Sequence, residues 1–374
     1  MKIAIVVPHI FMNQDILPDV IFSPGYLAID LAEGLQKLGQ DVTLFTPGRV
    51  NTNVKNIFAD LSLFEKELTQ RGDKYIDLLK KHPLIFINMA RQVQAEIIAN
   101  VFKMANVNEF DVVHIYTNEE ELGIAFADLC NKPVVFTHHE PFNFSVKYRS
   151  IMPKYKNRNW ISISNSQRKS MPSGTNFIAT IYHGMDTNKF VPIKKPSQDY
   201  IAYFGRIIEP KGVHLAIEAA KTAGVELRIA GKHYSDYAKD KYWSDIIEPQ
   251  IDGNKVKYVG FLKTDIEKQD FLGNAKALIV PSTWEEPFGM VMIEALACGT
   301  PVVGITAGAI PEVIEDRKTG LLVDNDKNVV KSLVDAINNI DSINRNTCRQ
   351  IFEERFSIER MCKEHLQAYK AFVK

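Results

Sequence analysis

Two glutamates, Glu286 and Glu294, stand eight residues apart in the part of the chain best equipped to bind a substrate. The apolar run Ala277–Val280 before them predicts a buried strand. Glu286 falls in the turn after that strand, and Glu294 falls about two turns along a predicted helix. The backbone N–H groups of Phe288, Gly289 and Met290 would then lie at the positive end of the helix, which suits a phosphate. Because a carboxylate only accepts hydrogen bonds, each glutamate suits sugar hydroxyls, and the pattern predicts a nucleotide-sugar site.

Two basic residues, Arg206 and Lys211, precede this segment in the second half of the chain. Arg206 follows the predicted strand Ile201–Phe204, and Lys211 comes just before a predicted helix. Both therefore belong at the carboxyl edge of a parallel sheet, where open α/β sheets bind their ligands. Two cations there could neutralise a departing diphosphate without a metal ion. The alternative is an ordinary pair of surface charges, but the glutamate segment favours the phosphate interpretation.

Further short motifs occur along the chain in a fixed order. They are Asp111-Val112-Val113-His114, Thr137-His138-His139, His183-Gly184-Met185-Asp186, Phe204-Gly205-Arg206, Glu209-Pro210-Lys211-Gly212, Leu227–Gly231, Val259–Leu262 and Thr319–Val323. With the two glutamates, these motifs resemble the retaining glycosyltransferases of family 4, whose signature is a pair of glutamates separated by seven residues. The resemblance implies an α/β protein with the GT-B fold, in which two Rossmann-like domains with parallel sheets face each other across a cleft.

The resemblance also implies roles for the glutamates. Glu294 would hold the ribose diol of the donor, and Glu286 would bind the donor sugar. The alternatives are a helix residue paired with a lysine for Glu294, and a charge that complements the helix dipole for Glu286. The base of the nucleotide would rest against the backbone of Gly260, Phe261 and Leu262.

A glycine, Gly25, opens the helix that follows the first strand and its long loop. A glycine there lets the backbone approach a diphosphate closely. Family members often have two glycines at this place, whereas this chain has Pro24, which has no N–H to donate. A simple helix start is an equally good interpretation. The loop also lacks the Gly-x-Gly-x-x-Gly pattern of a dinucleotide site, which counts against a dehydrogenase.

A histidine, His139, follows the predicted strand Pro133–Thr137 and matches the Thr-x-His of the family. Its neutral imidazole could accept a hydrogen bond from a hydroxyl of the donor sugar and position it. The alternative is a histidine that caps a loop. By contrast, His183-Gly184 is interpreted as part of a hinge rather than as a catalytic group.

The composition excludes several classes of protein. The chain has 374 residues, 45% of them hydrophobic, and equal numbers of basic and acidic residues. Zero net charge argues against a nucleic-acid-binding protein. The four cysteines have no zinc spacing, and reduced thiols in a cytoplasmic protein are the plain interpretation. No apolar run is long enough to span a membrane, since about 18 residues are needed.

A basic stretch, residues 147–160, contains five basic residues with two tyrosines and a tryptophan. It could touch an anionic membrane at its inner face or a phosphorylated acceptor. A solvated basic loop is the favoured alternative.

An Asp-x-Asp pattern, Asp324-Asn325-Asp326, occurs after the last predicted strand. Metal-dependent glycosyltransferases use this pattern, but its position next to Lys327 is typical of a turn. The prediction is therefore that the protein has no metal ion and no cofactor.

Strands and helices alternate along the chain, which predicts parallel sheets covered on both faces. The predicted strands are Lys2–Val7, Asp41–Phe45, Val112–Tyr116, Pro133–Thr137, Trp160–Ser164, Phe177–Tyr182, Ile201–Phe204, Leu227–Ala230, Val256–Val259, Ala277–Val280, Pro301–Val303 and Leu321–Val323. The predicted helices are about Tyr26–Leu38, Val213–Thr222, about Asp236–Ile247, Ile266–Asn274, Gly289–Ala297, about Val329–Ile340 and Ile358–Phe372, with a mostly helical insertion at about 55–107. We expect an acceptor-binding domain at 1–185, a donor-binding domain at 186–356 and a last helix at 357–374 that returns to the first domain.

The sequence thus predicts a retaining, metal-independent transferase that moves a hexose from a nucleotide-diphosphate sugar. A UDP-sugar is favoured over GDP-mannose, and the acceptor is a sugar, a lipid-linked sugar or a small molecule. The alternatives are a sugar-nucleotide epimerase or a phosphorylase of the same fold, and a regulator that binds nucleotide sugars without catalysis.

Overall fold

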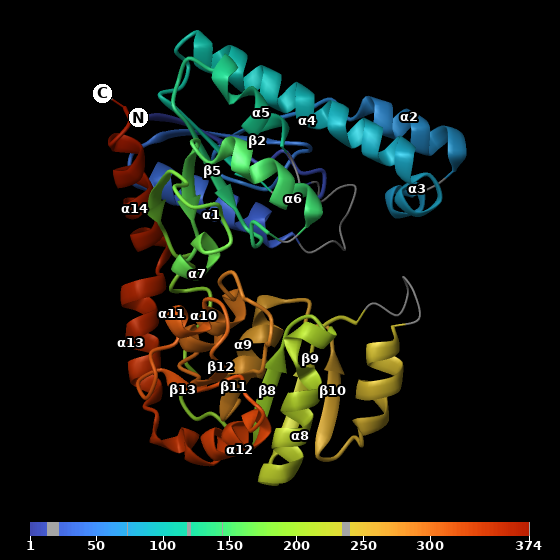
Figure 1. The fold of residues 1–374 in the computed structure, drawn as a ribbon, viewed down its shortest axis with the longest axis vertical. Helices are drawn as coiled ribbons and strands as arrows, with labels where there is room; N and C mark the ends of the chain where they lie inside the picture. Colours follow the sequence, from blue (N-terminus) through green and yellow to red (C-terminus); the bar gives the residue numbers. More distant parts are fainter. Residues whose placement is uncertain (13–21, 73, 118–120, 144, 234–239, 374) are drawn as a thin grey trace. The chain divides into compact units, whose positions relative to one another are not determined.

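The computed structural model describes residues 1–12, 22–72, 74–117, 121–143, 145–233 and 240–373. The chain forms two compact units (Figure 1). The first comprises Met1–Ile163, Gln167–Tyr182 and Met361–Lys374, and the second comprises Ser164–Ser166 and His183–Arg360. The sequence placed the domain ends at 185 and 356, a few residues from the ends of these units.

The first unit is built on a seven-stranded parallel sheet in the order β3-β2-β1-β4-β5-β6-β7. Its strands are β1 (Lys2–Val6), β2 (Asp41–Thr46), β3 (Lys55–Phe58), β4 (Val112–Thr117), β5 (Val134–His138), β6 (Asn159–Ser162) and β7 (Phe177–Thr180). Every residue of β4 and β5 is buried. This is expected of central strands whose sheet is covered by helices on both faces, and it explains their continuous apolar runs.

Helices surround this sheet. They are α1 (Ser23–Lys37), α2 (Ser62–Arg71), α3 (Tyr75–Lys81), α4 (Pro83–Asn106), α5 (Leu122–Phe126), α6 (Val146–Ile151), α7 (Asn165–Arg168) and α14 (Ile358–Lys370), with the 3₁₀ turns Ala127–Leu129 and Met152–Tyr155. The first two residues of α7, Asn165 and Ser166, belong to the second unit. Helix α1 begins three residues before the predicted start at Tyr26.

The insertion at 55–107 is not helical throughout, because it begins with the edge strand β3. That strand pairs with β2 from Thr43↔Lys55 to Thr46↔Phe58. Asn56 adds hydrogen bonds from its amide nitrogen to the carbonyl of Leu44 (3.1 Å) and the hydroxyl of Thr46 (2.9 Å). Pairing with a neighbouring strand, rather than any local pattern, makes this segment a strand.

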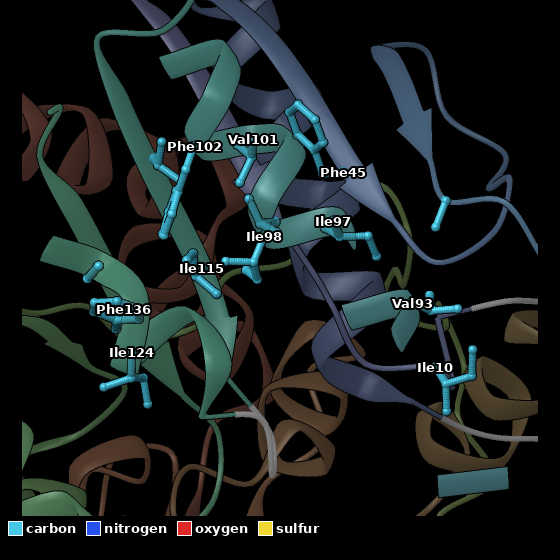
Figure 2. Packing of buried hydrophobic residues seen from close by; sticks show 14 of the residues in the cluster. Ile10, Phe45, Val93, Ile97, Ile98, Val101, Phe102, Ile115, Ile124 and Phe136 are labelled. Carbon is cyan, nitrogen blue, oxygen red and sulfur yellow. The ribbon is translucent and has the colours of Figure 1, made fainter. Parts of the chain in front are cut away.

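The core of the first unit lies between α4 and the sheet (Figure 2). Val93, Ile97 and Val101 recur along one face of α4 and are almost fully buried. They pack in one cluster with Phe45 of β2 and Ile115 of β4. Spacings of three and four residues place these side chains on one stripe of the helix.

The last helix, α14, belongs to the first unit from Met361 onward. Its buried residues, Met361, Cys362, His365 and Tyr369, recur at helical spacing. The thiol of Cys362 lies 3.8 Å from the backbone oxygen of Leu31 in α1. The helix is therefore anchored on the first unit by its own apolar stripe.

The second unit contains a six-stranded parallel sheet in the order β10-β9-β8-β11-β12-β13. Its strands are β8 (Tyr200–Phe204), β9 (Glu226–Ala230), β10 (Val256–Gly260), β11 (Ala277–Val280), β12 (Val302–Ile305) and β13 (Gly320–Val323). Its helices are α8 (Val213–Ala223), α9 (Asp265–Gly273), α10 (Met290–Ala297), α11 (Ile310–Val313), α12 (Val329–Asn339) and α13 (Arg345–Phe356), with the 3₁₀ turns Glu209–Lys211, Glu248–Gln250 and Ile340–Ser342. The strand order reverses between β8 and β11, and such a reversal is where open α/β sheets bind ligands.

Two helical segments of the second unit differ from the prediction. The helix predicted at Asp236–Ile247 lies partly outside the described residues, and its described part is a π-helical turn, Tyr242–Ile247. Helix α13 was not predicted, although its buried residues Cys348, Phe352 and Phe356 recur at intervals of four, because most of its other residues are polar. The side chain of Asn344 caps it, accepting hydrogen bonds from two backbone N–H groups.

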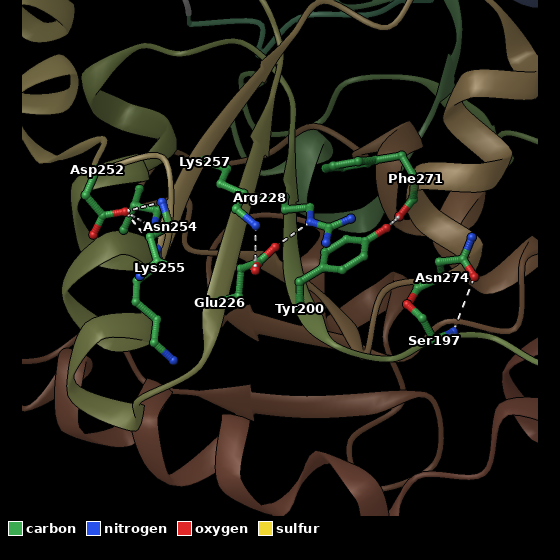
Figure 3. A network of polar contacts seen from close by, with 11 residues as sticks. Ser197, Tyr200, Glu226, Arg228, Asp252, Asn254, Lys255, Lys257, Phe271 and Asn274 are labelled. Atoms are coloured by element: carbon green, nitrogen blue, oxygen red, sulfur yellow. Dashed lines mark hydrogen bonds and ion pairs between the residues drawn. The ribbon is translucent and has the colours of Figure 1, made fainter.

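The amino edge of this sheet is tied by charged side chains (Figure 3). Glu226 pairs with Arg228 (2.6 Å) and with Lys257 (2.8 Å). The guanidinium of Arg228 lies 3.9 Å from the ring centre of Tyr200, whose hydroxyl donates to the carbonyl of Phe271 (2.6 Å). These groups bind one another at the edge opposite the expected ligand site.

None of the described helices is both long and apolar enough to cross a membrane.

Candidate functional site

Lys211 and Glu286 form an ion pair at the carboxyl edge of the second sheet. Lys211 ends the 3₁₀ turn Glu209–Lys211 after β8, and Glu286 lies in the loop between β11 and α10. These strands are neighbours at the point where the strand order reverses. Only 18% of the lysine side chain and 13% of the glutamate side chain are exposed. The structure thus brings together two residues, from different loops, that the sequence predicted for the same donor site.

The backbone of the two loops is in direct contact beside this pair. The N–H of Thr283 donates to the carbonyl of Pro210 (3.0 Å). Gly212 has a φ of +70°, and a Cβ there would lie 2.0 Å from the carbonyl oxygen of Pro281. Only glycine permits both this backbone angle and this close approach. The contact fixes how Lys211 and Glu286 face each other.

A third loop, between β12 and α11, supports Glu286 from another side. The N–H of Ala309 donates to the carbonyl of Glu286 (2.7 Å). Gly308 has a φ of +58°, and a Cβ there would lie 2.1 Å from the backbone nitrogen of Glu286. The sequence interpretation missed Gly308, whose only local signal is a glycine just before the helix start Ile310-Pro311.

Helix α10 begins at Met290, with Gly289 as its N-cap at a φ of +90°. Phe288 precedes the cap and is buried, and the ring of His183 packs edge-on against it at a centroid distance of 4.8 Å. The predicted hinge residue His183 therefore also supports this turn. The amino end of the helix points its partial positive charge to the loop that carries Glu286.

Arg206 follows β8 and is exposed. Its backbone oxygen accepts a hydrogen bond from the hydroxyl of Tyr203 (2.7 Å). Its guanidinium forms no hydrogen bond or ion pair with another described residue. The group thus retains its donors for an anion at this edge.

Glu294 lies in the second turn of α10, and its side chain is half-buried. Burial raises the pKa of its carboxyl above the ordinary value, while Lys268 and Lys189 oppose this shift and Asp265 adds to it. Within the described part of the chain, its carboxylate forms no ion pair, so the helix-pair alternative is not seen. A carboxylate that is partly desolvated and lacks a bonded partner is suited to accept hydrogen bonds from a ligand.

The residues predicted to lie near the base are the last residue of β10 and the two residues after it. Gly260 ends that strand at a φ of +84°, and its carbonyl accepts a hydrogen bond from the N–H of Gly231 (2.9 Å). The ammonium of Lys232 lies 4.6 Å from the ring centre of Phe261. These groups share the carboxyl edge with Arg206, since β10, β9 and β8 are consecutive in the sheet.

Gly25 lies in the first unit, near the amino end of α1. Its N–H donates to the carbonyl of Phe22 (3.0 Å). A Cβ there would lie 2.2 Å from the sulfur of Met12, so packing alone gives a reason for glycine. Its contact with a diphosphate stays a prediction.

His139 follows β5 in the first unit, at the carboxyl edge of that sheet. Its ring stacks on Tyr116 of β4, with a centroid distance of 4.8 Å and an interplanar angle of 26°. Its neighbour His138 is fully buried and stacks on Phe142. The two adjacent histidines therefore lie in different environments.

The basic stretch 147–160 buries two of its three aromatic residues. Tyr148 and Trp160 are core residues, at 3% and 0% exposed. Lys147 pairs with Glu121 (2.8 Å), and Arg158 pairs with Asp128. Two of the predicted basic groups are thus engaged within the first unit.

The Asp-x-Asp segment makes contacts typical of a turn. Asp324 accepts a hydrogen bond from the hydroxyl of Thr306 (3.2 Å), and Asp326 accepts one from the N–H of Asn328 (2.8 Å). Among the described residues, no group of three or more histidines, cysteines, aspartates or glutamates is arranged to hold a metal ion.

Glycosyltransferase families match both halves of the chain. Residues 185–354 match the family described as Glycosyl transferases group 1, and residues 25–189 match Glycosyltransferase Family 4. An uncharacterized protein of the cps region of Klebsiella pneumoniae is 27% identical over 308 residues, covering 73% of this chain and 82% of that protein. A phosphatidyl-myo-inositol mannosyltransferase from Propionibacterium freudenreichii is 23% identical over 332 residues, covering 84% of this chain and 80% of the relative.

A solved structure, that of Anabaena HepE in complex with UDP-glucose, has a similar fold. The TM-score is 0.66 and the identity 18%, with 99% of this chain and 100% of that chain covered. Together with the two parallel sheets, this similarity confirms the predicted α/β fold class with its GT-B architecture.

Proposed function

Because the chain belongs to the family 4 glycosyltransferases and has the GT-B fold, we propose that it transfers a hexose from a nucleotide-diphosphate sugar to an acceptor, with retention of configuration and without a metal ion. The observation that carries this proposal is the Lys211–Glu286 ion pair at the reversal of the strand order. It combines a cation for a phosphate and a carboxylate for sugar hydroxyls in one place.

The groups at this edge divide the work of binding and leaving-group stabilisation. Lys211 and Arg206, with the amino end of α10, stabilise the charge that develops on the departing diphosphate. Glu286 accepts hydrogen bonds from the donor sugar, and Glu294 accepts them from the ribose. The departing phosphate takes the proton of the acceptor hydroxyl on the face where the new bond forms, which accounts for retention without a covalent intermediate.

The remaining predicted residues supply positioning. His139 orients a hydroxyl of the donor sugar through its neutral imidazole. The backbone around Gly260, Phe261 and Leu262 supports the base. The Gly25 segment of the first unit approaches the diphosphate.

The donor we favour is a UDP-sugar, in keeping with the UDP-glucose bound by HepE. The acceptor is a sugar, a lipid-linked sugar or a small molecule. The mannosyltransferase relative, whose name specifies phosphatidyl-myo-inositol, makes a lipid-linked acceptor a sensible first choice in a screen.

The first experiment is thermal unfolding of the purified protein with UDP, GDP or ADP, with and without EDTA. A ligand that binds only the folded state raises the unfolding midpoint in relation to its affinity. We expect a shift with UDP that EDTA does not reduce, followed by transfer from a UDP-sugar in an acceptor screen. A shift abolished by EDTA would contradict metal independence. Donor binding without transfer or hydrolysis would favour the regulator, and conversion of the donor without an acceptor would favour the epimerase.

A further inference from the structure

A set of buried rings in the first unit connects helix α14 to His139. We define the aromatic stack as His139, Tyr116, His114 and Tyr369. Successive ring centres are 4.8 Å, 5.0 Å and 5.7 Å apart, with interplanar angles of 26°, 45° and 71°. Tyr116, His114 and Tyr369 are each at most 3% exposed. Because buried rings at these distances are in contact, a displacement of one is transmitted to the next.

The fold explains how residues so far apart in sequence meet. His114 and Tyr116 are two residues apart on β4, so their side chains lie on the same face of the sheet. Helix α14 contributes His365 and Tyr369, four residues apart, and the ring centre of His365 lies 5.6 Å from that of His114. The stack therefore extends from α14 to the end of β5, entirely within the first unit.

Both ring nitrogens of His114 are bonded, which leaves the imidazole little freedom. Its Nδ1 lies 2.6 Å from the hydroxyl of Tyr369, and its Nε2 lies 2.8 Å from the hydroxyl of Thr137. A neutral imidazole donates through one nitrogen and accepts at the other, so both hydroxyls satisfy it. Burial, and to a smaller extent His365, lowers the pKa of His114 well below its ordinary value, which keeps the ring neutral.

We propose that Tyr369 and His114 are positioning residues that set the orientation of His139 through the ring of Tyr116. The proposal rests on the proposed function of His139, and none of the three residues is assigned contact with substrate. Loss of the Tyr369 hydroxyl would leave a buried nitrogen of His114 without its partner, and the ring would have to move to find another. That movement would reach His139 through the stacked ring of Tyr116.

The test uses the full-length protein with Tyr369→Phe, Tyr116→Leu and Tyr116→Phe. Tyr200→Phe is the matched control, since it also removes a buried hydroxyl with a 2.6 Å hydrogen bond, but at the amino edge of the other unit. We expect kcat to fall roughly threefold to tenfold in Tyr369→Phe and Tyr116→Leu, since small misplacements of a positioned group are costly. The KM for the donor should change much less. Tyr116→Phe, which keeps the ring, should retain wild-type kcat.

A second measurement observes His139 without relying on turnover. The imidazole resonances of His139, assigned by their absence in His139→Gln, are followed by NMR in each variant. The proposal requires a changed His139 resonance in Tyr369→Phe and no change in Tyr200→Phe. Unchanged resonances and wild-type kcat in Tyr369→Phe would overturn it. If the wild-type protein transfers no sugar, the proposed function fails instead, and the resonances alone decide whether the stack positions His139.

Discussion

Lys211 and Glu286 are joined by an ion pair although they are 75 residues apart in the chain. The pair means that the cation we propose for the diphosphate is held by a carboxylate in the structure. In the proposed function, the diphosphate would replace the carboxylate at the lysine, and the sugar hydroxyls would donate to Glu286. The pair thus keeps a largely buried site neutral and its two side chains oriented toward each other.

Substitution Lys211→Ala should abolish most turnover while the protein stays folded. It removes the cation that would face the departing phosphate, and the loss of one such group typically lowers kcat by about 10²-fold to 10³-fold. Lys257→Ala is the matched control, because it breaks a 2.8 Å ion pair with Glu226 at the opposite edge of the same sheet. Transfer rates and circular dichroism would be measured for both variants. Wild-type transfer by Lys211→Ala would eliminate its assignment to the phosphate.

Substitution Gly308→Ala should weaken donor binding through Glu286. The new Cβ would stand 2.1 Å from the backbone nitrogen of Glu286, so the loop that carries the glutamate must shift. The control is Gly224→Ala, which has a φ of +73° but nothing within 4 Å of the new Cβ. Both variants incur backbone strain, of order 1–3 kcal/mol each, in thermal unfolding. Calorimetric titration with a UDP-sugar should show weaker binding for Gly308→Ala alone, and equal binding by both variants would contradict the role of this contact.

The sequence predicted the elements that local patterns specify and missed those that tertiary contacts create. The buried strand Ala277–Val280 is observed with the predicted bounds, since a short apolar run between turns signals it. Strand β3 was assigned to a helical insertion, because its short, half-exposed sequence becomes a strand only by pairing with β2. Likewise, Lys211 and Glu286 were predicted from motifs, whereas the support that Gly308 gives to Glu286 depends on a contact between loops that no local pattern encodes.

Acid should destabilise the first unit through buried histidines. Burial lowers the pKa of His9 and that of His138 to about 4. The unfolded chain takes up protons on these groups below about pH 6.5, while the folded unit does not, so stability is lost as the pH falls. Each such histidine should steepen this loss by about 1.4 kcal/mol per pH unit.

The substitution His138→Gln isolates one of these protons. Hydrogen exchange of the slowest amides of β4 and β5, corrected for intrinsic rates, would give the unfolding free energy of this unit against pH. The variant should lose stability less steeply than the wild type between about pH 6 and pH 5, and equally at about pH 7–8. Parallel curves over the whole range would refute a buried, neutral His138.

Substitution Glu294→Gln should stabilise the protein at neutral pH and weaken its binding of UDP. Burial raises the pKa of Glu294, so the folded protein bears a desolvation cost whenever this carboxyl is ionised. That cost is absent below the ordinary glutamate pKa of about 4.3 and grows as the pH rises through the raised value. The midpoint of thermal unfolding should therefore be higher in the variant near neutral pH, and the difference should shrink on acidification.

Ligand binding by the same variant should change in the opposite direction. A neutral amide accepts hydrogen bonds from ribose hydroxyls more weakly than a carboxylate, and about tenfold weaker binding of UDP is expected. Glu285→Gln is the matched control, since Glu285 is exposed and its side chain has no assigned contact with the donor. A gain in stability with unchanged UDP affinity would remove Glu294 from the donor site. A loss of affinity with no gain in stability at neutral pH would instead show that its carboxylate is well solvated in the folded protein.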